Sequence, residues 1–155
     1  MLSETSTLHI AVPHQQMLDA SCLHPLLDMQ CAPVRPVGYY AHRMFQGNVR
    51  QESRDVLYND EIDPTKVFQF LCSSEQIVTS SYHGTLWAVY FGKAVAVTDA
   101  FSEKFEMLPF VVSRDPANPT RIVDGAQIRD KCRAENMQFY ETYVKHSVRR
   151  ISNNT

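Results

Sequence analysis

The chain has no apolar run long enough to cross a membrane. Its longest such stretch, Leu86–Val97, is interrupted by Gly92 and Lys93, whereas a transmembrane helix needs about 18 apolar residues in succession. The first residues, Met1–Thr7, also lack the basic and apolar regions of a secretory signal peptide. These absences predict a cytoplasmic protein without a membrane span.

An excess of positive charge is missing as well. The 155 residues contain 15 Lys and Arg against 17 Asp and Glu, for a net charge of −2, whereas a nucleic-acid-binding domain would carry a basic patch. The hydrophobic content of 44% is that of a globular protein. We therefore predict one domain over residues 1–155, with a frayed tail at 152–155 and no nucleic-acid partner.

The sequence contains no C-x-x-C pair. Its four cysteines lie far apart, at Cys22, Cys31, Cys72 and Cys132. A zinc site formed by the first two cysteines with His14 and His24 would match no compact ligand spacing. We therefore expect reduced, mostly buried thiols, no metal site and no cofactor.

A helix is predicted to begin at Pro64. Asp63 is a favourable N-cap residue, and proline is well suited to the first helical position. The apolar residues that follow recur at helical spacing: Val67, Phe68, Phe70 and Leu71.

A strand–helix–strand unit follows this helix. Gln76–Ser80 is a β-branched strand, and Ser81 is a candidate cap for a helix over Thr85–Phe91. Gly92 stands where a helix ends in the left-handed conformation. Ala94–Thr98 then forms a second strand. Two short strands joined by a helix predict parallel pairing with a right-handed crossover.

The flanking sequence adds weaker elements. Strands are expected at Leu8–Val12, Val34–Tyr40, Phe110–Val112 and Arg121–Val123, and helical segments at Pro25–Met29 and Ala126–Val148. His42–Asn59 shows no clear period and is expected to be a loop with a helical stretch. Together these elements predict an α/β fold, a three-layer Rossmann-like domain with a mostly parallel sheet of about five strands.

Two loops at the carboxyl ends of the central strands are the predicted ligand site, because ligands of open parallel sheets bind there. In the first loop, the hydroxyls of Ser80, Ser81 and Thr85 are candidate donors to an anion, and Gly84 leaves the backbone open to a ligand. The start of the following helix favours negative charge.

His83 is the candidate catalytic residue of this first loop. The positive end of the helix favours its neutral imidazole, which can accept a proton from a hydroxyl group. In the second loop, Asp99–Phe105, Lys104 can neutralise an anion, and Ser102 and Glu103 can bond to hydroxyl groups.

Each of these residues also has a purely structural interpretation. Serine and histidine at a helix start are often caps, and Gly84 can simply permit close packing of helix on strand. Lys104 is a residue type that usually stands in solvent. The aromatic residues Trp87 and Tyr90 fit a core better than a platform for sugar stacking.

Three segments resemble the C-terminal half of polysaccharide pyruvyl transferases: Ile77–Gly84, Phe91–Val97 and Phe101–Phe105. The resemblance extends over about Asp63–Leu108. The family has two Rossmann-like halves, as in GT-B glycosyltransferases, and transfers the enolpyruvyl unit of phosphoenolpyruvate to a sugar. The resemblance therefore implies a transferase of exopolysaccharide or cell-envelope glycan biosynthesis, with a glycan acceptor.

By this resemblance, His83 is the catalytic acid/base and the Ser80–Gly84 loop holds the donor. The chain would then be a donor-binding half that acts as a homo-oligomer or with a partner half-domain. Two alternatives stay open: a glycosyltransferase-like domain with a nucleotide-sugar donor, and a catalytically degenerate domain for anion binding or interaction. The residues available for an apolar association face are Phe45, Phe101, Phe105, Met107 and Phe110.

Overall fold

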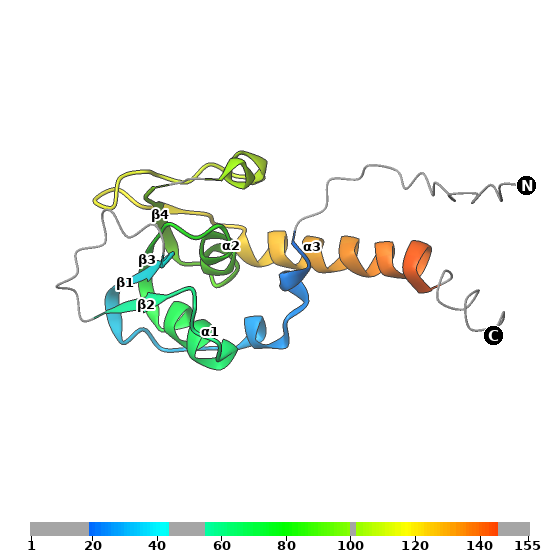
Figure 1. Ribbon diagram of the computed structural model, residues 1–155, viewed down its shortest axis with the longest axis horizontal. Helices are drawn as coiled ribbons and strands as arrows, with labels where there is room; N and C mark the ends of the chain where they lie inside the picture. Colours follow the sequence, from blue (N-terminus) through cyan, green and yellow to red (C-terminus); the bar gives the residue numbers. More distant parts are fainter. Residues whose placement is uncertain (1–18, 44–54, 100–101, 146–155) are drawn as a thin grey trace, which may run out of the picture.

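The computed structural model describes residues 19–43, 55–99 and 102–145. They contain a five-stranded sheet of order β2-β1-β3-β4-β5, seen on the left of Figure 1. The strands are β1 (Arg35–Ala41), β2 (Val56–Tyr58), β3 (Ser74–Thr79), β4 (Ala94–Val97) and β5 (Thr120–Arg121). The first four are parallel, and only the edge strand β5 pairs antiparallel. The predicted α/β fold with a mostly parallel sheet of about five strands is confirmed.

The helices α1 (Pro64–Cys72) and α2 (Tyr82–Tyr90) make the crossovers into β3 and β4. As predicted, Asp63 caps α1, since its Oδ1 accepts a hydrogen bond from the Thr65 N–H at 2.9 Å. Gly92 follows α2 with a φ of 67°, the left-handed conformation that glycine adopts without steric cost.

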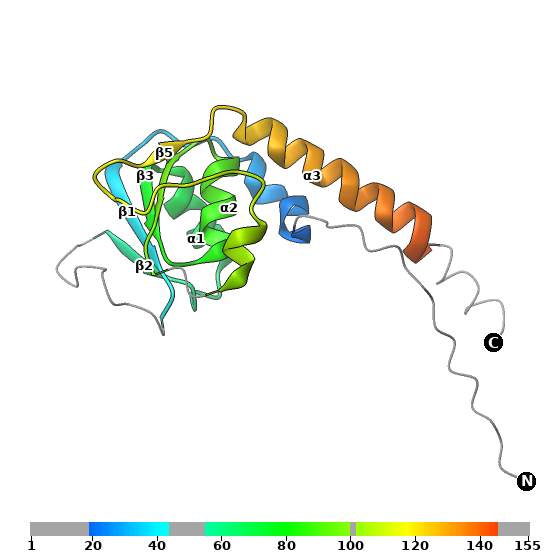
Figure 2. The same ribbon diagram turned by 90° about the horizontal axis from the view of Figure 1, so that it is seen from above.

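Two apolar clusters hold three layers together. The first lies between the sheet and the two crossover helices, and consists of Tyr40, Val67, Leu71, Ile77, Ala88, Val89, Val95, Val97 and Phe105. The second lies on the outer side of these helices, and consists of Cys22, Leu27, Phe68, Leu86, Tyr90 and Cys132. It packs them against α3 (Gly125–Phe139) and two short 3-10 helices, Ala20–Leu23 and Pro25–Asp28. The C-terminal half of α3 extends beyond this body (Figures 1 and 2).

Pro36 lies within β1, although proline cannot donate to a sheet ladder. The register explains why it is tolerated. On one side β1 pairs with β3 from Arg35 onward, but on the other side β2 reaches only Tyr39–Ala41. Pro36 is not among the β1 residues paired with β3, although Arg35 and Val37 on either side of it are, so the ladder is interrupted at the proline near the start of the strand.

Several predicted elements differ from the structure. Phe110–Val112 is not a strand, and the strand expected at Arg121–Val123 is only Thr120–Arg121. The region expected to be a loop contains β2, whose three residues are too few to show a period. Beyond α3 the chain continues as a π-helical turn, Tyr140–Val144. Predictions for Leu8–Val12, for 146–148 and for the 152–155 tail lie outside the described residues.

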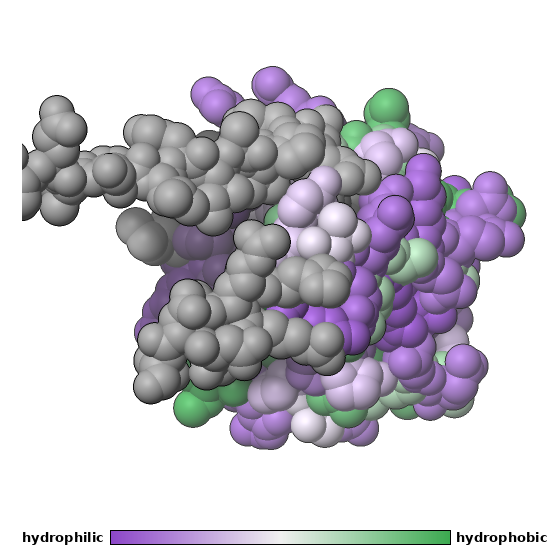
Figure 3. Space-filling model, turned by 90° about the vertical axis from the view of Figure 1, so that its right-hand side faces the viewer, coloured by the Kyte–Doolittle hydropathy of each residue, from purple (hydrophilic) through white to green (hydrophobic). Residues whose placement is uncertain are grey.

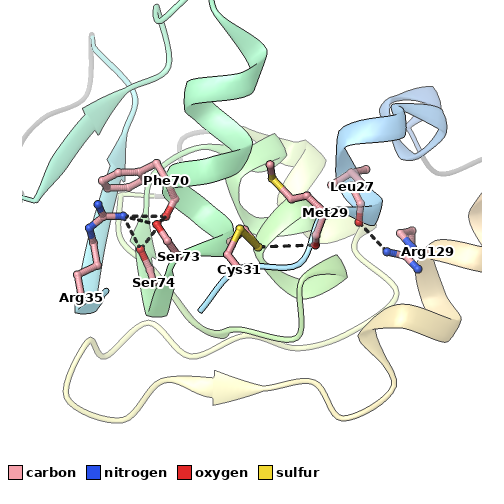
Figure 4. Close-up of a disulfide and its surroundings, with 9 residues drawn as sticks. Leu27, Met29, Cys31, Arg35, Phe70, Ser73, Ser74 and Arg129 are labelled. Carbon is pink, nitrogen blue, oxygen red and sulfur yellow. Dashed lines mark hydrogen bonds between the residues drawn. A yellow bond between two sulfur atoms is a disulfide. The ribbon is translucent and has the colours of Figure 1, made fainter. Parts of the chain in front are cut away.

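The expectation of four reduced cysteines is wrong for one pair. Cys31 and Cys72 form a disulfide with their Cα atoms 5.6 Å apart (Figure 4), a normal separation for such a bond. Cys31 lies in the segment that leads from the second 3-10 helix to β1, and Cys72 ends α1. The two cysteines are 41 positions apart, so the sequence gives no sign that they are close in space. Cys22 and Cys132 are buried free thiols, as expected.

Within the described parts of the chain, no helix has the length and apolar character needed to cross a membrane.

Candidate functional site

The predicted Ser80–Gly84 loop follows the carboxyl end of β3, but α2 begins at Tyr82 rather than at Thr85, so the loop includes the first turn of the helix. Ser81 is the N-cap of α2, and its Oγ accepts a hydrogen bond from the Gly84 N–H at 3.2 Å. The Ser81 carbonyl also receives the Thr85 N–H at 3.0 Å. The N–H groups of Tyr82 and His83, in the same first turn, have no such intrahelical acceptor.

The hydroxyl groups proposed as ligand donors already have protein partners. Ser80 Oγ accepts from the His42 N–H at 2.9 Å, and Thr85 Oγ1 donates to the Ser81 carbonyl at 3.0 Å. Both residues are fully buried, with 0% of their surface exposed. In this structure these side chains fix the loop.

Gly84 permits close packing of α2 on the sheet. A Cβ atom at this position would lie 2.4 Å from Cδ1 of Tyr40 and 2.7 Å from Oγ1 of Thr79. That Oγ1 donates to the Tyr40 carbonyl at 2.6 Å and accepts from the Ser81 N–H at 3.0 Å. The glycine therefore lets the helix start approach β1 and β3, which is the structural interpretation of this residue.

His83 lies in the first turn of α2 and is paired with Asp19. Its Nε2 is 2.7 Å from Oδ2 of Asp19. A carboxylate only accepts hydrogen bonds, so Nε2 carries the proton in this pair and Nδ1 is the second, reactive nitrogen. The side chains are 42% and 29% exposed, respectively, so the pair is accessible from solvent.

Trp87 supports the imidazole one helical turn further along α2. The two rings have centroids 5.4 Å apart, and the Trp87 Nε1–H donates to Ser21 Oγ at 2.9 Å. Ser21 also binds Asp19, through a backbone N–H that donates to Oδ1 at 2.7 Å. The first 3-10 helix and its N-cap residue therefore hold both the carboxylate and the indole beside His83.

Asp19 remains ionised over a wide pH range. Its partial burial raises the carboxyl pKa, but hydrogen bonds from the Ser21 N–H, His83 and the Ser21 hydroxyl outweigh burial, so the net pKa is lowered. Burial and the nearby carboxylate of Asp19 raise the pKa of Tyr82. The site therefore presents a fixed negative charge behind a half-exposed imidazole.

The second predicted loop lies close to the first. The Phe105 ring is buried and lies 5.9 Å from the Tyr82 ring, centroid to centroid. Ser102 caps the 3-10 helix Glu103–Met107 by accepting the Lys104 N–H at 3.3 Å. Glu103 and Lys104 are exposed. The structure thus brings the two loops together, with Lys104 on the solvent side and Ser102 in a structural role.

The proposed apolar association face is only partly exposed. Phe105 belongs to the core, and Phe110 packs against it, whereas Met107 is exposed. Phe45 and Phe101 lie outside the described residues. The coloured surface seen in Figure 3 is mainly hydrophilic, with apolar residues scattered among polar ones.

Asp19 is the residue that sequence reasoning missed. It lies 64 residues before His83 in the sequence. A pairing between two segments so distant in the chain depends on how the first 3-10 helix packs against α2 and α3. A single sequence carries no signal for that contact.

Two hollows lined by described residues lie at the opposite end of the parallel strands, where the strands begin. One has a volume of about 530 Å³ and is lined by residues that include Arg35 and Phe70. The other has a volume of about 290 Å³ and is lined by residues that include Lys93 and Arg129. Cys31 borders both hollows, so the disulfide lies between them (Figure 4).

Comparison with known proteins adds no relative: no family model, no curated protein and no solved structure matches this chain.

Proposed function

We propose that this chain is a donor-binding domain of the polysaccharide pyruvyl transferase type, acting in exopolysaccharide or cell-envelope glycan biosynthesis. The observation that carries the proposal is the position of His83. It lies at the start of the helix after β3, half-exposed and paired with a carboxylate. A ligand at the carboxyl end of a parallel sheet meets this position. The resemblance of Ile77–Gly84 to the family points to the same residue.

In the proposed reaction His83 is the acid/base. Nε2 donates to Asp19, so Nδ1 is the nitrogen that transfers protons. It takes the proton of the attacking sugar hydroxyl or returns a proton to the methylene carbon of the enolpyruvyl group. The hydroxyl oxygen bonds to the enolpyruvyl carbon that carries the phosphate, and phosphate leaves. A second hydroxyl of the sugar then completes the ketal.

The negative groups of the donor bind at the start of α2. The first-turn N–H groups of Gly84 and Thr85 are taken by Ser81, which leaves those of Tyr82 and His83 for the ligand. The exposed ammonium of Lys104 in the neighbouring loop supplies positive charge. This donor set is small, and we expect a dissociation constant of about 0.1–1 mM.

Transfer itself requires a second Rossmann-like half in addition to the donor-binding half. Orientation of the acceptor supplies a large share of the rate, and the donor-binding half alone does not provide it. We place this activity in the cytoplasm, as expected from the sequence. Cytosolic thiols are normally kept reduced, whereas Cys31 and Cys72 are bonded in the structure. The redox state of this pair in the cell therefore tests the placement.

Calorimetry with phosphoenolpyruvate, inorganic phosphate and a nucleotide sugar tests the proposal. Phosphoenolpyruvate should bind the wild-type protein more tightly than phosphate does. His83→Ala should weaken binding modestly and abolish transfer in the assembled enzyme. Tighter binding of the nucleotide sugar would replace this function with that of a glycosyltransferase-like domain.

A catalytically degenerate domain is the second candidate. The observation in its favour is that the side chains of Ser80, Ser81 and Thr85 are all engaged within the protein. On this alternative no donor shifts the calorimetric signal at 10 mM, about ten times the weakest expected constant, and pull-downs recover a protein partner instead.

A further inference from the structure

The hollow of about 290 Å³ lies between the disulfide and the start of α3, at the edge of the sheet opposite His83. Its wall combines two kinds of residue. Lys93 and Arg129 are cationic, whereas Leu27, Tyr90, Phe91 and Val123 supply apolar and aromatic surface. Such a wall suits a ligand with one negative group and an apolar body.

The two cations differ in what neutralises them. Arg129 donates to the Leu27 carbonyl at 2.7 Å (Figure 4) and lies near the carboxylates of Asp28 and Asp130, at 3.5 and 3.2 Å. Its charge is therefore already balanced. Lys93 makes no ion pair within the described residues; Arg121 and Glu75 are the charged groups that act on it.

Lys93 is held as a partly desolvated cation. Burial lowers the pKa of its ammonium group, and the nearby guanidinium of Arg121 lowers it further, against the opposing effect of Glu75. Arg121 stays in place because its Nη1 donates to the Gly92 carbonyl at 2.6 Å. A negative group in the hollow would relieve both effects, since it would compensate the charge of the ammonium and screen it from Arg121.

The apolar part of the wall includes an exposed side chain whose burial by a ligand would be favourable. Val123, two residues after the end of β5, is 90% exposed. Phe91, on the other side, is partly buried against both apolar clusters. The first turn of α3, at Ala126, forms another part of the wall.

We propose that this hollow binds a small amphipathic anion, whose carboxylate or phosphate group pairs with Lys93 and whose apolar body lies against Phe91 and Val123. The site is separate from the one at His83, because it lies where the parallel strands begin and the His83 site lies where they end. It does not depend on the proposed transferase function.

Calorimetry with phenyl phosphate and with benzoate tests the proposal on the full chain, and the two probes separate a phosphate from a carboxylate preference. We expect binding with a dissociation constant of about 1 mM for the preferred probe. Lys93→Gln should weaken it on the order of tenfold, and Lys93→Arg should retain it. The matched control is Lys131→Gln, whose side chain is 78% exposed in solvent and should change nothing.

Amide shifts in nuclear magnetic resonance spectra give a second measurement on the wild-type protein. The preferred probe should shift the signals of Lys93, Val123 and Ala126, and His83→Ala should leave these shifts unchanged. Benzyl alcohol, which is neutral, should bind more weakly than either anion. The proposal is overturned if neither anion shifts these signals at 10 mM, if Lys93→Gln binds as well as wild type, or if benzyl alcohol binds equally well.

Discussion

The imidazole of His83 and the carboxylate of Asp19 are joined by a 2.7 Å hydrogen bond between two layers of the fold. His83 belongs to the crossover helix α2, and Asp19 precedes the first 3-10 helix of the outer layer. The only charged partner of the imidazole in the described part of the site therefore comes from a different segment of the chain.

Asp19→Asn should lower the free energy of unfolding by about 0.5–1 kcal/mol at neutral pH. The pair is partly exposed, which reduces the value of a charge-assisted hydrogen bond. The pKa of Asp19 is lowered in the folded protein, so its stabilising effect is present above the unfolded pKa of about 3.9 and disappears as the pH falls through the lower folded value. Urea denaturation of both proteins from about pH 6 down to pH 2 checks this; a difference that grows in acid would contradict it.

Gly84→Ala should destabilise the fold by roughly 1–3 kcal/mol, because the new methyl group would overlap Tyr40 and Thr79. Gly92→Ala is the matched control. Nothing lies within 4 Å of a Cβ there, so only the positive φ opposes the substitution, at a cost of about 1 kcal/mol. Gly84→Ala should therefore have a lower denaturation midpoint than Gly92→Ala. Equal midpoints would show that α2 can move away from the sheet.

Ser81→Ala should lower the free energy of unfolding by about 1 kcal/mol, since it removes the N-cap hydrogen bond to Gly84. Ser102→Ala removes the equivalent bond, 3.3 Å long, from a short exposed 3-10 helix, and should cost less. Thermal unfolding of both variants is the measurement. If Ser81→Ala is neutral in stability but weakens phosphoenolpyruvate binding, Ser81 is a ligand residue and its cap is incidental.

Lys104→Gln should weaken phosphoenolpyruvate binding by roughly three- to tenfold without changing stability, because its ammonium group is exposed and makes no ion pair with the described residues. Raising the ionic strength from about 0.05 to 0.5 M should weaken wild-type binding similarly. Lys131→Gln serves as the control of equal charge. Calorimetry measures the affinity of each variant for phosphoenolpyruvate. Equal affinities for both lysine variants would show that Lys104 does not bind the donor.

Reduction of the Cys31–Cys72 disulfide should lower the free energy of unfolding by up to roughly 4 kcal/mol, the loop-closure value for residues 41 positions apart. Chemical denaturation with and without dithiothreitol measures the loss. Cys31→Ser should match the reduced wild type and should not respond to dithiothreitol. A wild-type protein that is equally stable under both conditions would show that the bond does not form in solution.

Local signals allowed the sequence to predict the central part of this fold. Asp63, Ser81 and Gly92 each act within a few residues of chain, as two N-caps and a helix end, and all three were recognised. The two parallel strands flanking α2 each contain a short run of buried residues, Ile77–Thr79 and Val95–Val97, which is the pattern that such strands show.

Elements that depend on distant partners were missed. Strand β2 has three residues and exists because it pairs with Tyr39–Ala41. Phe110–Val112 has the composition of a strand, yet Phe110 and Val112 pack on the apolar clusters instead, and Val111 is exposed. The candidate site divides in the same way: the position of His83 follows from local pattern, whereas Asp19 and the disulfide depend on packing between segments.

The disulfide also shortens the covalent route between the two residues of the His83–Asp19 pair. Along the backbone they are 64 residues apart. Through the sulfur bridge the route runs 12 residues from Asp19 to Cys31 and 11 from Cys72 to His83. Closing the shorter loop costs about 0.9 kcal/mol less in chain entropy, so in an unfolded chain the oxidised form brings carboxylate and imidazole together roughly fivefold more often. Oxidation of two cysteines near the start of the parallel strands thus favours assembly of the histidine site at the end of the strands.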